Sequence, residues 1–160
     1  MGNSTATTTL TVNSAFLSEV KEVNEDLWRL TDEVRRLCSD PSAIHAAPLA
    51  FAQKLEQLRD QLALHFVLEE AYGYFEDSVE VAPRLCELAY SLRAEHPRLY
   101  LQICELVDRA ARLVRVRRSS REVLEITAAF VSFDDQFRRH EAREVDMIQE
   151  EYDGDLGVGD

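Results

Sequence analysis

The stretch LCELAYSLRAEHPRLYLQICELVDRAARL, residues 85–113, determines the expected fold. Its apolar positions recur at steps of three and four residues, which is the period of one buried helical face. Pro83 lies just before it, and proline suits the first turn of a helix. The stripe consists of Leu85, Leu88, Leu92, His96, Leu99, Ile103, Leu106, Ala110 and Leu113.

The same period predicts three further helices on either side of this one. The first spans about 15–37 after Ser14 as N-cap, and the second follows Pro48 and ends near Gly73 to Phe75. The last begins after Ser119 or Ser120, with these residues on its inner side: Leu124, Thr127, Val131, Phe133, Phe137, His140, Glu144 and Met147. Four long helices joined by short connections predict an all-α, up-down-up-down four-helix bundle.

The domain organisation follows from where this period begins and ends. Residues 1–13 are rich in threonine and serine and are expected to form a flexible N-terminal arm. Residues 14–150 form the bundle, and 151–160 form an acidic, irregular C-terminal tail. Pro97 is expected to kink the third helix beside His96, because proline cannot donate a backbone hydrogen bond.

Composition excludes several classes of function. Eighteen basic and 30 acidic side chains give a net charge of −12, which opposes binding to nucleic acid and to anionic membrane surfaces. No apolar run reaches the ~18 residues of a membrane span, and the N-terminus does not resemble a signal peptide. The three cysteines form no CxxC pair and suit buried free thiols, so the expected location is the cytoplasm.

A layer of polar residues interrupts the apolar stripes. His65 and Glu69 form one H-x-x-x-E pair and His140 and Glu144 form another, so each pair lies on one helical face. His96 interrupts the third stripe. His96 lies 21 residues before Arg117 and His140 lies 21 residues after Ser119, which places both at the same depth. His65 and His96 lie at similar depths from the connection between their helices. The five side chains are therefore expected to meet inside the bundle.

Such a layer requires compensation for its charges. Buried and unpaired imidazoles or carboxylates cost several kcal/mol each. A metal cation would supply the compensation, since imidazole suits iron and zinc and carboxylates can bridge two metals. The alternative is a metal-free network in which histidines and glutamates satisfy one another.

Three segments resemble the hemerythrin-like (HHE cation-binding) family: HFVLEE at 65–70, RAEHPRL at 93–99 and RRHEAREVDMI at 138–148. The resemblance covers about residues 15–150. It implies a four-helix bundle with a non-haem di-iron site. It also implies that His65 and His96 are terminal ligands, that Glu69 and Glu144 are bridging carboxylates, and that His140 is the ligand from the last helix.

The chain departs from that family in its first helix, which contains no histidine. Val20 occupies the expected place, and valine cannot coordinate a metal. Glu19 or Asn24 is a candidate replacement, and His45 is a more remote one. The metal position shared by the first two helices is therefore expected to be weak, and the site to hold one or two iron ions or none.

These observations favour a cytoplasmic, non-haem iron protein that is not an enzyme. The resemblance implies that it binds or senses a diatomic ligand, oxygen or nitric oxide, or iron itself. The alternative is a metal-free helical interaction module with a decayed site and a protein partner at the acidic tail. An oxidase of the di-iron type is disfavoured, because few carboxylates lie near the histidines.

Overall fold

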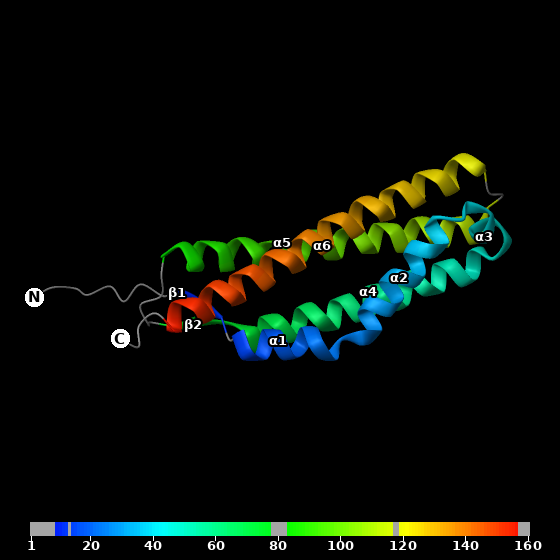
Figure 1. Cartoon of the computed structure of the whole chain (residues 1–160). Coiled ribbons are helices and arrows are strands. Elements are labelled where there is room, and N and C mark those ends of the chain that lie inside the picture. The colour runs from blue at the N-terminus through cyan, green and yellow to red at the C-terminus, as the bar shows by residue number, and fades with distance from the viewer. Residues whose placement is uncertain (1–8, 13, 78–82, 117–118, 157–160) are drawn as a thin grey trace, which may run out of the picture.

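The computed structural model describes residues 9–12, 14–77, 83–116 and 119–156. They form a helical bundle with two short strands at one end (Figure 1). The predicted all-α helical bundle is confirmed, and the two strands have only four residues each. In chain order the elements are β1 (Thr9–Val12), α1 (Ser14–Val23), α2 (Glu25–Cys38), α3 (Pro41–Ala46), α4 (Pro48–Leu68), the π-helix η1 (Glu69–Gly73), β2 (Tyr74–Asp77), α5 (Pro83–Arg115) and α6 (Ser120–Leu156).

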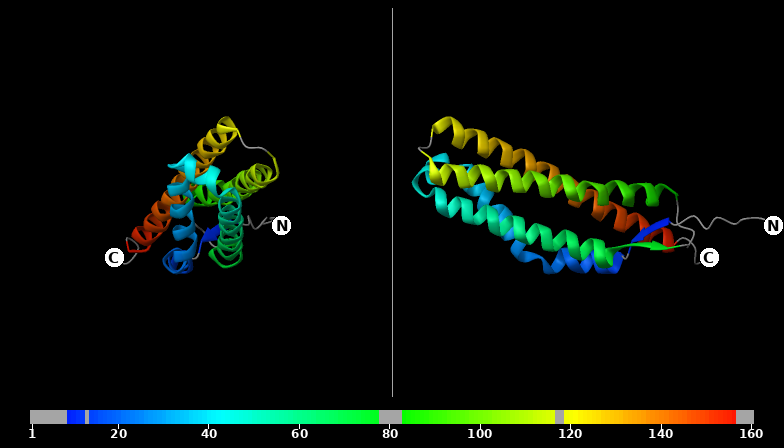
Figure 2. Two further views of the ribbon diagram at one scale, coloured as in Figure 1. Left: turned by 90° about the vertical axis from the view of Figure 1, so that its right-hand side faces the viewer. Right: turned by 180° about the vertical axis from the view of Figure 1, so that it is seen from behind.

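The long helices lie side by side, and the chain reverses direction from one to the next (Figures 1 and 2). α4 packs against α2 and α5, and α6 packs against α5 and α2. The stripe predicted for α5 is buried from Leu92 to Leu113 and faces this core. A helix with one apolar face is stable in water only when that face is covered, so the four surfaces close on one another.

The inner side predicted for α6 is buried at six of its eight residues: Thr127, Phe133, Phe137, His140, Glu144 and Met147. Leu124 and Val131, predicted to face inward, are 56% and 47% exposed. Val123 and Phe130, each one residue earlier, are buried in their place, and the rings of Phe133 and Phe137 stack with centroids 6.1 Å apart. Apolar residues occupy two neighbouring faces of α6, and the face with the aromatic rings is buried because it removes more apolar area from water.

Asn24 divides the first predicted helix into α1 and α2. Its backbone leaves the helical region at φ −87° and ψ 51°, and its side-chain oxygen accepts a hydrogen bond from the backbone nitrogen of Leu27 at 3.4 Å. Asparagine side chains compete in this way with helical hydrogen bonds, which makes asparagine a favoured N-cap. The prediction of one continuous helix is therefore wrong at this residue.

The end of α4 changes its helical type. α4 ends at Leu68, and Glu69–Gly73 continue as a π-helix, η1. Single-turn π-helices are uncommon and occur frequently at functional sites, because the wider turn re-aims the side chains that follow. Here the wider turn begins at Glu69, a residue of the predicted polar layer.

The other helix boundaries agree with the predicted start signals. Pro83 is the first residue of α5, and α5 continues as an α-helix through Pro97. Ser119 precedes α6 and forms a capping box with Glu122. The Ser119 hydroxyl accepts from the backbone nitrogen of Glu122 at 3.1 Å, and the Glu122 carboxylate accepts from the backbone nitrogen of Ser119 at 3.4 Å.

We expect Ser119→Ala to lower the free energy of unfolding by about 1 kcal/mol, because one of these two hydrogen bonds is lost. Urea unfolding followed by circular dichroism measures the change. Ser120→Ala, at the first residue of the helix, is the matched control and should change stability by less than about 0.5 kcal/mol. Equal effects of the two substitutions would contradict the capping role.

The two strands join parts of the chain that are distant in sequence. β1 pairs antiparallel with β2, from Thr9 opposite Asp77 to Val12 opposite Tyr74. The sequence TLTV alternates threonine with apolar residues, which suits a strand with one covered face. The segment 1–13, expected to be a flexible arm, therefore contains the strand β1. Its other residues, 1–8 and 13, lie outside the described part of the chain.

The end of α6 extends into the predicted tail. The helix continues to Leu156, six residues beyond the expected boundary at 150, and residues 157–160 are not described. Within the described ranges, no helix has both the length and the apolar character that crossing a membrane requires.

Candidate metal centre

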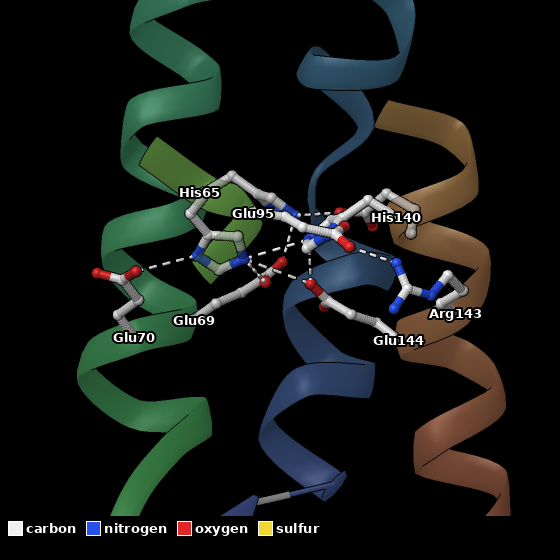
Figure 3. Close-up of polar contacts among 9 residues, drawn as sticks. His65, Glu69, Glu70, Glu95, His140, Arg143 and Glu144 are labelled. Atoms are coloured by element: carbon white, nitrogen blue, oxygen red, sulfur yellow. Dashed lines mark hydrogen bonds and ion pairs between the residues drawn. The ribbon is translucent and has the colours of Figure 1, made fainter. Parts of the chain in front are cut away.

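The structure brings all five predicted site residues into one buried layer. They come from the end of α4, the start of η1, the middle of α5 and the middle of α6. None is more than 2% exposed: His65, Glu69, His96, His140 and Glu144. The i,i+4 spacing of the two H-x-x-x-E pairs places each imidazole beside its carboxylate, as Figure 3 shows for Glu69 and Glu144.

Four of these residues form the first donor group: Glu69, His96, His140 and Glu144. One donor atom of each lies within 4.8 Å of the others. Nε2 of His96 is 3.2 Å from Nε2 of His140, 3.4 Å from Oε1 of Glu144 and 3.5 Å from Oε2 of Glu69. Two imidazole nitrogens and two carboxylates that converge in this way are the usual ligand types of a transition metal.

A second donor group lies beside the first and consists of His65, Glu69 and Glu141. Nε2 of His65 contacts Oε1 of Glu69 and is 3.0 Å from Oε1 of Glu141. Glu69 therefore directs one oxygen to His65 and the other to His96. Because its carboxylate belongs to both groups, Glu69 is placed to bridge two cations.

Glu141 is the site residue that the sequence analysis missed. It follows His140 directly and is skipped by the H-x-x-x-E pattern. The helical period could have identified Glu141, because it lies four residues after Phe137 and seven before Ile148 on the same helical face. All three residues are buried. Among the described residues Glu144 belongs only to the first donor group, so of the two carboxylates expected to bridge, only Glu69 lies in both.

The outer nitrogen of each imidazole has a partner of its own. In all three rings Nε2 faces the donor groups and Nδ1 faces outward. Hydrogen bonds of this kind fix the orientation of a metal-binding imidazole, and a carboxylate partner makes it a stronger ligand. Nδ1 of His96 contacts Glu70 at 3.1 Å and Nδ1 of His140 contacts Glu95 at 2.8 Å, whereas Nδ1 of His65 accepts a hydrogen bond from the amide nitrogen of Asn24 at 2.9 Å.

The candidates for the missing ligand of the first helix do not join either donor group. Glu19 is exposed, and Asn24 contacts the outer nitrogen of His65 instead of facing the layer. His45 lies in α3, at the opposite end of the bundle from β1 and β2 (Figure 1). Val20 lies in α1, and its side chain is not among those described. In the described residues the third member of the second group is Glu141, from α6.

The carboxylates change the proton affinity of the imidazoles. Burial opposes a charged His65, but its hydrogen bonds with Glu141 and Glu69 outweigh burial and raise its pKa to about 9. Burial likewise opposes a charged His140, and Glu144 and Glu95 raise its pKa. Without a metal, protons on these two rings compensate part of the buried negative charge.

Glu95 responds in the opposite direction. Burial favours its neutral form, but hydrogen bonds from His140 and Arg143 lower its pKa. The guanidinium of Arg143 forms an ion pair with Glu95 at the edge of the layer (Figure 3). His140, Glu95 and Arg143 therefore form a chain of hydrogen bonds from the core to the surface.

Aromatic rings enclose the layer. Phe66 stacks on His96 with centroids 4.1 Å apart, and it meets His140 edge-on at 5.9 Å. Phe137 meets His65 edge-on at 6.4 Å. These rings help to bury the imidazoles, and burial strengthens the electrostatic interactions among the donor groups.

Two surface pockets adjoin the layer. One, of about 330 Å³, reaches His140 between α5 and α6 and is also lined by Glu95, Arg98 and Arg143. The other, of about 340 Å³, is lined by Asn24 together with Leu64, Leu68 and residues of α1 and α2. A small ligand would meet one of the two imidazole-supporting side chains, Glu95 or Asn24, before it reached the core.

Comparison with known proteins finds no matching family model, no matching curated protein and no matching solved structure. Function is therefore inferred from the residues of the layer. Their geometry is compatible with a bound cation, because the donors converge, are buried, and have outer partners that orient the rings.

Proposed function

We propose that this chain is a non-haem iron-binding protein of the hemerythrin-like type. In this proposal the bundle has the up-down-up-down topology of that family, and its core holds one or two iron ions. The protein binds or senses oxygen, nitric oxide or iron and does not turn over a substrate. The observation that carries the proposal is the position of Glu69, whose two oxygens face His65 and His96 in two adjacent donor groups.

The donor set fits iron. Three imidazoles and three carboxylates, from Glu69, Glu141 and Glu144, supply the nitrogen and oxygen ligands that iron accepts. Three carboxylates in one buried layer are costly unless cations offset them. Bound iron would supply a redox-active Lewis acid with affinity for a diatomic ligand.

The chain's own residues position and isolate such an ion. The outer hydrogen bonds hold each imidazole with Nε2 inward, which leaves little rotational freedom to be lost when a metal binds. Phe66 and Phe137 cover the imidazole faces and edges and exclude bulk water. The pocket at His140 offers a small ligand an approach between α5 and α6.

A second candidate function has its own supporting observation. The raised pKa values of His65 and His140 mean that protons can balance part of the carboxylate charge without any metal. On this alternative the chain is a metal-free interaction module whose acidic C-terminal segment binds a protein partner. The polar layer would then only help to specify the packing of the helices.

One experiment separates the two candidates. The protein is produced in iron-supplied cells, and its iron content, its visible spectrum and its thermal midpoint with anaerobic Fe(II) are measured. The iron proposal predicts bound iron, and it predicts a midpoint that rises with Fe(II) because the metal binds only the folded state. The double variant His65→Ala, His140→Ala should lose both effects.

The matched control is His45→Ala, which removes a histidine outside both donor groups. It should retain the iron and the thermal shift. The iron proposal is wrong if the wild-type chain contains no metal, takes up none from Fe(II), and gains no stability from it. That result would favour the interaction module.

The outer hydrogen bonds give a smaller test. We expect Glu95→Ala to weaken metal binding about 10–100-fold, because it removes the carboxylate that holds Nδ1 of His140 and pairs with Arg143. Competition with a coloured chelator measures the affinity. Glu105→Ala, an exposed glutamate of the same helix, is the control and should leave the affinity unchanged.

A further inference from the structure

The two donor groups differ in composition. The first offers two imidazoles and two carboxylates, from His96, His140, Glu69 and Glu144. The second offers one imidazole and two carboxylates, from His65, Glu69 and Glu141. Imidazole nitrogen suits iron, zinc and copper, whereas carboxylate oxygen suits harder cations such as Mn²⁺ and Mg²⁺. The second group is therefore relatively better suited to a hard cation.

The outer partners increase this difference. The two imidazoles of the first group are held by carboxylates, Glu70 on His96 and Glu95 on His140. A carboxylate on the outer nitrogen raises the basicity of the ring and strengthens it as a ligand. Nδ1 of His65 instead accepts a hydrogen bond from the amide nitrogen of Asn24, which does not raise the basicity of the ring. The only imidazole of the second group is thus supported by the weaker partner.

Glu141 determines the composition of the second group. Among the described side chains, neither donor group includes a residue of α1 or α2. Glu141 has an oxygen 3.0 Å from Nε2 of His65 and is only 6% exposed. A carboxylate from α6 therefore completes a position to which α1 contributes no described donor.

We propose that the core is a mixed-metal centre. The position at His96 and His140 takes an imidazole-preferring cation, iron or zinc, and loads first. The position at His65, Glu69 and Glu141 takes a hard divalent cation of the Mn²⁺ class and loads second. This inference rests on the proposed function, because both positions belong to the same layer and share Glu69.

The test uses Zn²⁺ and Mn²⁺ as probes of the two positions. Metal-free protein receives one equivalent of Zn²⁺ and is then titrated with Mn²⁺, while electron paramagnetic resonance measures the free Mn²⁺. We expect one Mn²⁺ to bind per Zn²⁺-loaded chain. Glu141→Gln should lower the affinity for this Mn²⁺ by more than about 100-fold, because the loss of an outer hydrogen-bond partner alone lowers metal affinity by up to that factor. The first Zn²⁺ should remain bound.

Two further variants make the result specific. Glu141→His converts the second group to two imidazoles and one carboxylate, so it should bind a second Zn²⁺ in preference to Mn²⁺. This gain of binding cannot result from misfolding. Asp135→Asn removes an exposed carboxylate from the same helix and should leave both metals bound.

Different results would overturn the mixed-metal centre and the proposed iron-binding function. If neither Zn²⁺, Fe(II) nor Mn²⁺ binds to the wild-type chain, the proposed function fails and the mixed-metal centre fails with it. If Zn²⁺ or Fe(II) binds but no Mn²⁺ follows, only the mixed-metal inference is overturned. The inference is also overturned if Glu141→Gln leaves Mn²⁺ binding intact or if Glu141→His leaves the metal preference unchanged.

Discussion

Replacement of Glu69 by glutamine should abolish metal binding at both positions. Glu69 is the one described residue that belongs to both donor groups, with one oxygen toward His65 and the other toward His96. A glutamine keeps the size of the side chain but loses its charge, and its amide nitrogen cannot coordinate. We expect the affinity of each position to fall by more than about 100-fold, beyond the loss that an outer partner produces.

Metal analysis after dialysis and calorimetric titration measure this effect. Glu70→Ala is the matched control, because Glu70 is the next residue in η1, belongs to neither donor group, and contacts the outer nitrogen of His96. Glu70→Ala should lower the metal affinity of the first donor group by about 10–100-fold and leave the second group unchanged. The bridging role is contradicted if Glu69→Gln keeps one position at full affinity. The metal-free alternative predicts a change of stability and no change in metal content.

The stability of the metal-free protein should fall as the pH rises. The pKa of His65 is raised from 6.5 to about 9, so its stabilising contribution is complete below pH 6.5 and is lost as the pH passes through about 9. The side chain is fully buried, and a shift of this size corresponds to about 3 kcal/mol. Urea unfolding across this pH range, without metal, measures the loss.

The metal-loaded protein should behave differently. A metal ligand must be a neutral imidazole, so cation and proton compete for His65, and metal affinity rises with pH until that proton is gone. The loaded protein should therefore not lose stability between pH 6.5 and about 9. His65→Ala should remove its share of the pH dependence of the metal-free protein, whereas His45→Ala should not. A metal-free protein whose stability rises over this range would contradict the assignment.

Much of the fold and most of the candidate site could be predicted, because both depend on local periodicity. The stripe of α5 from Leu92 to Leu113 is buried as predicted, and the Ser119 cap is confirmed. The two H-x-x-x-E pairs lie on single helical faces because four residues make about one turn. The histidines were found because each stands where an apolar residue would continue a stripe.

Other features depend on how the helices meet. Adjacent residues of a helix point about 100° apart. At the edge of an apolar stripe, the packing of neighbouring helices therefore decides which of two adjacent side chains is buried. The partners of α6 bury Glu141 and expose Leu124, and the sequence analysis predicted neither. The break at Asn24 is likewise coupled to a distant residue, since the same side chain caps α2 and contacts His65.

The local sequence pattern predicted the long helices, most of their buried faces and five of the six residues in the two donor groups. These properties follow from the period of the helix and from the cost of placing charge among apolar side chains. Three features follow from the packing of distant segments: the pairing of β1 with β2, the inclusion of Glu141, and the sharing of Glu69 between the two donor groups. These depend on distances between residues far apart in the chain, which packing sets and local pattern does not.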